Sequence, residues 1–474
     1  MNMAIHQQAD TDLHKILKRQ RIAFQQQPFA DAAIRIDWLK RLKQSLLDHQ
    51  QALLDALSRD YGHRSVDDSM LSDIMPVINN INYSIKHLKG WMKPSRRHAG
   101  LMLAPASVKV HYQPLGVVGI IVPWNFPVML SLGPLTTALA AGNRAMLKLS
   151  EFTPATNAVI RQLLDAAFAP EQVAVIEGEA DVAAAFSALP FDHLLFTGST
   201  LVGRHVMRAA ADNLTPVTLE LGGKSPVIIA PDIPLADAVE RLIYGKCLNA
   251  GQICVAPDYV LCPEHKVDEF VATYQQKFRA MYGEVARNPD YGNIINERQH
   301  QRLLSLLDDA LTKGATVYSA SDEPLNTASR KLATQLLTGV TPQMTLMQEE
   351  IFGPLLPIVA YQTLDEAIDF VNARPRPLAL YLMSFDKATQ QQVLDNTLSG
   401  GVCINETVFH VAADDAPFGG IGPSGMGHYH GREGFLQFSH ARTVLARGRI
   451  NTGKLVHPPY GNWLQRLLVK FFVR

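Results

Sequence analysis

Cys254 is the residue of this sequence best suited to act as a nucleophile. It lies in the segment Gly245–Pro257, where Ala250, Gly251 and Ala256 leave room around the thiol. A nucleophilic thiol must be approached closely by its substrate, and nearby backbone amides can face a developing oxyanion. The ordinary use of a single cysteine is as a small buried hydrophobe. Two further sites favour the catalytic interpretation.

Glu220 and Asn125 add a carboxylate and a side-chain amide in two further segments. Glu220 lies in Leu-Glu-Leu-Gly-Gly-Lys, which we expect to form a glycine-bearing loop after an apolar run. Asn125 follows residues 117–122, which are typical of a short buried strand that ends at a proline turn. Ligands bind at the carboxyl ends of such strands in open α/β sheets. A thiol, a carboxylate and a side-chain amide are together suited to acyl transfer through a covalent intermediate.

Two other segments have features of a dinucleotide site. Lys148 lies in a second short buried strand, 145–149, and Glu151 follows it just before a Thr-Pro pair that predicts a capped helix start. Without context, such a lysine packs its stem and extends its ammonium to water as readily as it binds a ligand. Residues 193–203 indicate a strand, a turn and a helix in that order. The free N–H groups at such a helix start suit a pyrophosphate.

These motifs together resemble those of the aldehyde dehydrogenase superfamily. In that family a Gly-Gln-x-Cys motif carries the nucleophile, here Cys254, and a Leu-Glu-Leu-Gly-Gly-Lys motif carries the base, here Glu220. The resemblance extends from about Leu39 to the last helix. The stretch Phe418–Gly431 is similar to the class 3 branch, and its flank Asn405–Ala412 is similar to the coniferyl aldehyde dehydrogenases of that branch.

The resemblance implies a set of cofactor contacts. Lys148 and Glu151 match the Lys-x-x-Glu pair that binds the adenosine ribose, although Leu149 replaces the proline of the commoner Lys-Pro-Ser-Glu. Because a carboxylate at this position repels a 2′-phosphate, we expect NAD as the cofactor, with NADP as the alternative. The other implied contacts are Gly198, Ser199 and Gly203 for the phosphates, Glu350 for the nicotinamide ribose, and Phe352 beside the nicotinamide ring.

The resemblance also implies the fold and the assembly. We expect an α/β protein with the aldehyde dehydrogenase-like fold: a Rossmann-type cofactor domain, an α/β catalytic domain, and a small oligomerisation hairpin and tail. The expected boundaries are 1–95 and 115–221 for the NAD(P)-binding domain, 222–439 for the catalytic domain, and 96–114 with 440–474 for the oligomerisation elements. A homodimer is implied.

The expected reaction is oxidation of an aldehyde to the carboxylic acid through a thiohemiacetal and a thioester on Cys254. The implied substrate is aromatic, such as coniferyl aldehyde, or a medium-chain aliphatic aldehyde. The alternatives are a broad-range aliphatic aldehyde dehydrogenase with an esterase side activity, a coenzyme A-acylating enzyme, and a non-catalytic protein on the same fold. Glu220 argues against the acylating enzyme, and the presence of all three catalytic residues argues against the non-catalytic protein.

Composition limits the partners of the chain. Its 474 residues include 44 Lys and Arg against 44 Asp and Glu, so no overall field favours nucleic acid. The four cysteines, Cys247, Cys254, Cys262 and Cys403, show neither a paired framework nor zinc-ligand spacing, so we expect no metal and a reducing compartment. The first fifteen residues contain no apolar signal segment, and we therefore expect the cytoplasm.

The last residues, 462–474, have the pattern of an amphipathic helix. One half carries Trp463, Leu464, Leu467, Leu468, Phe471 and Phe472, and the other half carries Arg466 and Lys470, with Arg474 near the boundary. The segment is too short to span a bilayer. It could dock on protein, either near its own substrate entrance or on a dimer partner, or it could lie on a membrane surface. We favour docking on protein because the net charge of the chain is zero.

Overall fold

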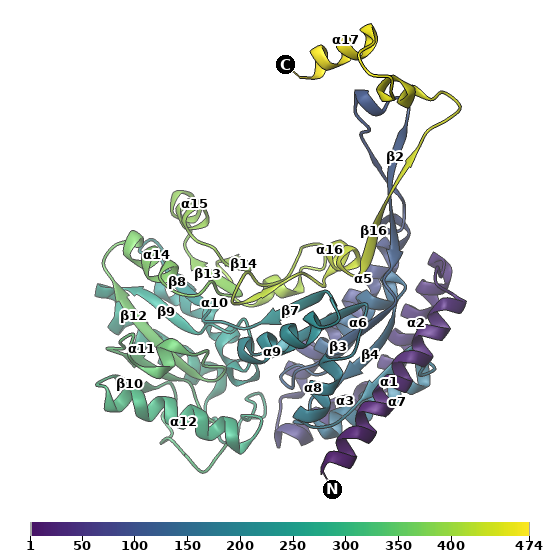
Figure 1. Cartoon of the computed structure of the whole chain (residues 1–474). Helices are drawn as coiled ribbons and strands as arrows, with labels where there is room; N and C mark the ends of the chain where they lie inside the picture. Colours follow the sequence, from purple (N-terminus) through teal and green to yellow (C-terminus); the bar gives the residue numbers. More distant parts are fainter. Residues whose placement is uncertain (1, 474) are drawn as a thin grey trace.

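The computed structural model describes the backbone of residues 2–473 and the side chains of residues 12–473. It forms two α/β lobes, each built around its own sheet, and a long arm (Figure 1). The arm rises from the lobe that contains the N-terminus and carries the last helix at its tip. The α/β class predicted from the sequence is confirmed. Arg474, which entered the helix prediction, lies outside the described residues.

The first lobe contains a six-stranded sheet whose five longer strands are parallel. Its central strands are apolar runs buried on both faces, as expected where helices cover both sides of a parallel sheet. The strands predicted over 117–122 and 145–149 are therefore confirmed. In spatial order the strands are β15 (Gly425–Met426), β7 (Val217–Leu221), β6 (His193–Gly198), β3 (Val117–Ile121), β4 (Arg144–Lys148) and β5 (Val173–Ile176).

The helices of the first lobe come mainly from the N-terminal part of the chain. Five leucines of this part, at 39, 42, 46, 53 and 57, have no exposed surface and contribute to the core. The helices are α1 (Asn2–Gln26), α2 (Ala32–Asp48), α3 (Gln50–Tyr61), α4 (Val66–Ser69), the π-helix η1 (Met70–Ile74), α5 (Met75–Trp91), α6 (Met129–Ala141), α7 (Pro154–Ala167), α8 (Ala180–Ser187), α9 (Thr200–Ala211) and α16 (Gly431–Gln437).

The start of α7 is capped differently from the sequence prediction. Thr153 occupies the N-cap position, but its side chain makes no capping hydrogen bond. Instead, Asp60 from α3 accepts hydrogen bonds from the backbone N–H groups of Ala155 and Thr156, at 2.9 and 2.8 Å. The carboxylate comes from a residue distant in sequence, so the local pattern could not identify it.

The second lobe contains a seven-stranded sheet in which only β10 is antiparallel to its neighbour. In spatial order its strands are β10 (Thr316–Ser319), β11 (Gln335–Thr338), β12 (Leu355–Tyr361), β9 (Tyr259–Pro263), β8 (Pro226–Ile229), β13 (Ala379–Met383) and β14 (Gly401–Ile404). The helices are α10 (Leu235–Cys247), η3 (Leu248–Gly251), η4 (Glu264–Lys266), α11 (Val267–Tyr282), α12 (Glu297–Thr312), α13 (Thr345–Gln348), α14 (Leu364–Asn372), α15 (Lys387–Asn396) and η5 (Phe409–Ala412).

The arm is built on a three-stranded antiparallel sheet with the order β1-β2-β16. At its tip, α17 extends from Trp463 to Phe472, with Asn462 as its N-cap, which confirms the predicted tail helix. No residue of α17 is buried, and the helix stands away from both lobes (Figure 1). The elements of the arm are β1 (Ser95–Arg97), η2 (Leu101–Leu103), β2 (Ser107–Pro114), β16 (Ser439–Ala446), η6 (Thr452–Val456) and α17.

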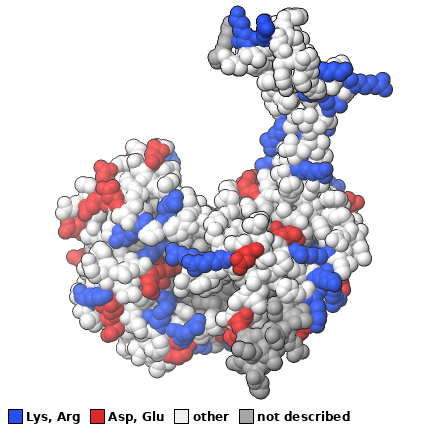
Figure 2. All heavy atoms as spheres, in the orientation of Figure 1, with Lys and Arg blue, Asp and Glu red and all other residues white. Residues whose placement is uncertain are grey.

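The arm is also distinct in charge. Residues 95–114 and 439–474 include ten Lys and Arg and no Asp or Glu. Figure 2 shows basic side chains along the arm, whereas both signs are mixed over the lobes. Among residues 2–473, no helix is long and apolar enough to cross a lipid bilayer.

Candidate active site

The segment that carries Cys254 leaves α10 through a tight left-handed turn. Asn249 and Ala250 have φ angles of 48° and 53°, a conformation that costs a residue with a Cβ roughly 1–2 kcal/mol. Gly251 follows at φ 75°, and a Cβ there would lie 2.7 Å from the carbonyl oxygen of Gly353. We call Leu248–Pro257 the nucleophile loop.

Contacts at both ends hold the nucleophile loop in this conformation. The Gln252 side chain donates to the carbonyls of Asn249 and Asn293, at 2.9 and 3.1 Å, and accepts from the N–H of Ile295 at 3.0 Å. Beyond Cys254, the buried ammonium of Lys246 donates to the carbonyl of Pro257 at 2.9 Å. The glutamine of the Gly-Gln-x-Cys motif is thus an internal brace of the loop.

The Cys254 thiol is half-buried and strongly disfavours its charged form. Burial, followed by the negative charges of Glu350 and Glu220, raises the pKa of the thiol from 9 to about 12. Hydrogen bonds from the backbone N–H groups of Cys254 and Val255 act in the opposite direction. In this state the thiol is protonated at neutral pH, so a proton must leave before it can attack.

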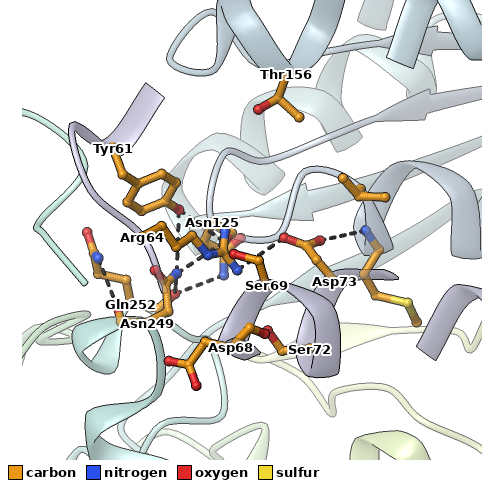
Figure 3. A network of polar contacts seen from close by, with 12 residues as sticks. Tyr61, Arg64, Asp68, Ser69, Ser72, Asp73, Asn125, Thr156, Asn249 and Gln252 are labelled. Atoms are coloured by element: carbon orange, nitrogen blue, oxygen red, sulfur yellow. Dashed lines mark hydrogen bonds and ion pairs between the residues drawn. The ribbon is translucent and has the colours of Figure 1, made fainter. Parts of the chain in front are cut away.

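Asn125 lies just beyond the end of β3, as predicted, and reaches the nucleophile loop. Its side chain is 3% exposed, and Nδ2 donates to the backbone carbonyl of Gln252 at 3.2 Å. Its own backbone carbonyl accepts from Tyr61, Arg64 and Asn249 (Figure 3). The amide of Asn125 and the loop that carries Cys254 are therefore directly connected.

Glu220 lies on a strand, which corrects the expectation of a loop. It is the fourth residue of β7, which pairs with β6 on one side and with β15 on the other, where Glu220 faces Gly425. The glycines that suggested a loop follow the strand. The pairing depends on β15, which lies about 200 residues later and could not be inferred locally.

The Glu220 carboxylate is buried without a hydrogen-bond partner. Its side chain is 4% exposed, and neither oxygen has a partner among the described residues. Burial raises its pKa well above the ordinary value of 4.5. Unpartnered buried carboxylates are costly to a fold and typical of sites that exchange protons.

The predicted dinucleotide residues lie at the carboxyl edge of the first sheet. Lys148 ends β4 and is 2% exposed; its ammonium donates to the carbonyl of Leu149 at 2.7 Å and lies 3.9 Å from the Glu151 carboxylate. Burial lowers the pKa of Lys148, and Glu151 opposes that shift. Leu149 keeps a backbone N–H, which donates to the carbonyl of Ile176 at 3.0 Å and which a proline at this position would lack.

Residues 198–203 form the predicted strand, turn and helix. Gly198 ends β6, and Ser199 is the N-cap of α9, with Oγ accepting from the N–H of Val202 at 3.4 Å. Gly203 lies in the first turn of α9, where a Cβ would approach Leu221 to 2.6 Å. Gly203 thus permits close packing of α9 on β7.

Glu350 and Phe352 come from the second lobe and lie close to residues of the first. The Glu350 carboxylate rests on Gly222, where a Cβ would lie 2.2 Å from its oxygens. Its Oε1 is buried without a partner, and burial raises its pKa to about 8. Phe352 has a left-handed φ of 49° and makes an edge contact with Trp124 at 5.3 Å.

The profile of the aldehyde dehydrogenase family matches residues 2–444. The chain belongs to the aldehyde dehydrogenase family.

Relatives of this aldehyde dehydrogenase span nearly its whole length. A probable coniferyl aldehyde dehydrogenase of Pseudomonas aeruginosa is 56% identical, over 99% of this chain and 98% of the relative. The substrate-bound structure of Staphylococcus aureus AldH superposes with a TM-score of 0.91 at 38% identity, covering 97% of this chain and 99% of that one. The Mycobacterium tuberculosis aldehyde dehydrogenase complexed with NAD⁺ gives 0.84 at 28% identity, covering 94% and 92%.

Membership of the family establishes the class of reaction. The chain is an oxidoreductase that acts on aldehydes, as the sequence predicted. Use of NAD(P) is typical of the family.

The sequence analysis did not identify the residues that support Asn125 of this dehydrogenase. Tyr61, Arg64, Asp73 and Asn249 surround its backbone carbonyl and the adjacent loop (Figure 3). They come from three segments, residues 61–64, η1 and η3, and no sequence pattern links these segments to Asn125. The only signal in the sequence was the presence of Arg64 and Asp73, two opposite charges in a helical region. Such charges usually lie in solvent, so they did not indicate a buried pair.

Proposed function

We propose that this enzyme oxidises an aldehyde to its carboxylic acid with Cys254 as nucleophile, Asn125 as oxyanion donor and Glu220 as general base. One observation carries the assignment: the thiol, two buried carboxylates and the Asn125 amide converge between the lobes, and the carboxylates raise the pKa of the thiol. Carboxylates raise the pKa of a thiol by charge repulsion only when they lie close to it.

The proposed reaction begins with transfer of the Cys254 proton. Glu220 accepts that proton, directly or through water, and the thiolate attacks the carbonyl carbon to form a thiohemiacetal. The oxyanion accepts hydrogen bonds from Asn125 Nδ2 and from the backbone N–H of Cys254. Removing one such donor typically costs about 3 kcal/mol in the barrier.

The second half of the proposed reaction hydrolyses a thioester. A bound NAD(P)⁺ would supply the acceptor for a hydride from the carbon attached to sulfur. Glu220 first releases to solvent the proton that it took from Cys254. It then accepts a proton from the water that attacks the thioester, and the acid leaves as a proton returns to the Cys254 sulfur. The high pKa of Glu220 suits a group that must accept protons near neutral pH.

The residues present fit a dinucleotide. Oε1 of Glu350 is a buried acceptor without a partner, which suits the hydroxyls of the nicotinamide ribose. The Cβ-free face of Gly222 lies against this carboxylate, and Phe352 is held by Trp124 nearby. We propose that Lys148 and Glu151 bind the adenosine ribose, and that Gly198, Ser199 and the start of α9 bind the phosphates. We also propose that residues 1–95 and 115–221 form the NAD(P)-binding domain and that residues 222–439 form the catalytic domain.

We propose an aromatic aldehyde such as coniferyl aldehyde as the substrate. The support is the 56% identity to a probable coniferyl aldehyde dehydrogenase and a hollow of about 610 Å³ beside α10. Tyr244 and Phe409 line this hollow and stack with ring centroids 5.9 Å apart. Next to Phe409, His410 packs on Tyr381, whose hydroxyl donates to the carbonyl of Val255 beside Cys254.

We further propose a homodimer formed through the arm. Its strand β16 is an exposed edge of the three-stranded sheet, and exposed edges pair readily with another chain. No apolar side chain of α17 is buried in the monomer. Four free cysteines accord with our further proposal of a cytoplasmic location.

The proposal is tested by steady-state kinetics on a panel of aromatic and aliphatic aldehydes with NAD⁺ and NADP⁺. Cys254→Ser is expected to abolish dehydrogenase and esterase activity while leaving NAD⁺ affinity near that of the parent. Cys247→Ser is the matched control, because Cys247 is a buried thiol seven residues away. Loss of activity in the control, with activity kept in Cys254→Ser, would overturn the assignment. A higher kcat/KM for aliphatic aldehydes would remove the aromatic preference alone.

A further inference from the structure

A buried ion pair lies behind the proposed oxyanion donor. Arg64 and Asp73 are 1% and 0% exposed, and the guanidinium Nη2 lies 3.1 Å from the Asp73 carboxylate. The guanidinium also lies over the rings of Tyr61 and Phe126, at 5.1 and 4.8 Å from their centroids. The pair is therefore enclosed by protein on several sides.

The pair contacts the loop between β3 and α6 at its middle, at Asn125, and at its end, where α6 begins. Arg64 Nη1 donates to the carbonyl oxygen of Asn125 at 3.0 Å. Asp73 Oδ1 accepts from the N–H of Met129 at 2.8 Å, which is the first residue of α6. Val128, the N-cap residue of α6, offers no side-chain cap, so Asp73 takes that place. The loop between β3 and α6 is thus fixed at Asn125 and at Met129.

The same carbonyl oxygen connects the ion pair to the nucleophile loop. It accepts from the Tyr61 hydroxyl at 3.0 Å and from Asn249 Nδ2 at 3.1 Å, in addition to Arg64. Asn249 is one of the two left-handed non-glycine residues of the nucleophile loop. Its side chain lies between the Asn125 carbonyl and the bend that leads to Cys254 (Figure 3).

Stability alone does not explain such a pair. Taking two charges out of water costs several kcal/mol per ion, and apolar replacements of buried pairs are often neutral or stabilising. What a buried pair supplies is a fixed geometry, since its hydrogen bonds admit few alternative arrangements. Here the fixed guanidinium of Arg64 holds the peptide group of Asn125 through its hydrogen bond to the carbonyl oxygen.

We propose that Arg64, held by Asp73, is a positioning residue for the oxyanion site: it fixes the peptide of Asn125, and thereby orients the Asn125 amide relative to Cys254. The inference rests on the proposed role of Asn125. Arg64 touches neither substrate nor cofactor, and acts only through the carbonyl that it binds. A misplacement of about 1 Å at a reacting group can cost about a hundredfold in rate.

The test measures the first-order rate constant of the pre-steady-state NADH burst at saturating aldehyde and NAD⁺. This constant does not depend on the fraction of folded enzyme, so reduced stability alone leaves it unchanged. In Arg64→Met/Asp73→Asn, which removes both charges together, we expect a fall of about tenfold to a hundredfold. Arg64→Lys, which keeps a donor and a charge, is expected to recover part of the rate.

Arg35→Met is the matched control. Arg35 is also a buried arginine that donates to backbone carbonyls, at Ala30 and Ala140, but it contacts the opposite end of α6. We expect a lower Tm and an unchanged burst constant. A fall in the burst constant as large as that of the Arg64 variant would overturn the inference, because any buried arginine would then suffice.

Asn125→Ala separates the inference from the proposed function. We expect Asn125→Ala to slow the burst, and the Arg64 and Asp73 changes to cause little further loss on that background. If Asn125→Ala leaves the burst unchanged, the proposed role of Asn125 fails. If Asn125→Ala slows the burst but the Arg64 variant does not, or if the two losses multiply, the positioning role alone fails.

Tyr61→Phe keeps the test available if the charge variants do not fold. It removes one donor to the same carbonyl and leaves the ion pair intact. A severalfold slower burst is expected, again without further loss on the Asn125→Ala background. An unchanged burst constant in Tyr61→Phe would contradict the inference.

Discussion

Alkylation of Cys254 by iodoacetamide in the cofactor-free enzyme reports on the charges that surround the thiol. The reactive species is the thiolate, and burial together with Glu350 and Glu220 raises the thiol pKa from 9 to about 12. At pH 7 the thiolate fraction is therefore about a thousandfold lower than for an ordinary thiol of pKa 9. A more basic thiolate is also more nucleophilic, and a Brønsted slope of about 0.45 recovers roughly twentyfold. We expect a net rate about fiftyfold lower.

The assay follows carbamidomethylation of the peptide that contains Cys254 by mass spectrometry between pH 7 and pH 10. Measurement at the peptide level excludes the other three thiols, Cys247, Cys262 and Cys403. Because each pH step of one raises the thiolate population tenfold while the pH stays below the pKa, the logarithm of the rate should rise with a slope of one. No plateau is expected in this range.

Two outcomes would refute this reasoning. One is a plateau at or below pH 9, and the other is a rate at pH 7 equal to that of a free cysteine. The variant Glu350→Gln gives the sign of the charge effect. Removing that carboxylate lowers the pKa of Cys254, so alkylation at pH 8 should become faster; a slower reaction would show that Glu350 does not face the thiol.

The remaining predictions concern hydrolysis, cofactor choice and the arm. Glu220→Gln should give a burst of NADH close to one per active site, slower than in the parent because Cys254 loses its proton acceptor, followed by a slow steady state; steady turnover at the parent rate would exclude Glu220 as the base in thioester hydrolysis. The parent should have a higher kcat/KM with NAD⁺ than with NADP⁺, and Glu151→Gln should narrow the difference, because a carboxylate repels a 2′-phosphate; a parent preference for NADP⁺ would reverse the assignment. Deleting residues 462–474 should weaken the dimer in analytical ultracentrifugation, or change the preference for aldehyde length, with NAD⁺ affinity unchanged. If only the intact enzyme sediments with anionic liposomes, and kinetics and oligomeric state are the same in both, α17 is instead a membrane-surface helix.

The elements that short sequence patterns describe were predictable. Buried apolar runs predicted β3 and β4, and the strand-turn-helix order of 193–203 predicted β6 and α9, because both depend on neighbours in the chain. The motif around Cys254 was recognisable because a reactive thiol needs small neighbours. These features depend on local chemistry, which the sequence displays directly.

The features that depend on distant partners were not predictable. Glu220 was expected in a loop, since its pairing partner Gly425 is remote in sequence. The support of Asn125 by Arg64 required knowledge of where α3 ends relative to β3. In each case the deciding contact joins two segments that carry no complementary pattern in the sequence.

The concentration of positive charge on the arm makes this electrically neutral chain strongly dipolar. Residues 95–114 and 439–474 carry ten cations and no anions, so the remaining residues carry 34 Lys and Arg against 44 Asp and Glu. In 0.1 M salt, charges more than about 10 Å apart are largely screened from each other. A charged resin therefore interacts mainly with the face of the protein that touches it. The enzyme should therefore be retained on a cation exchanger through the arm, and on an anion exchanger through the lobes, near its pI of about 7.3. Its chromatographic behaviour thus follows from where its charges lie rather than from their sum.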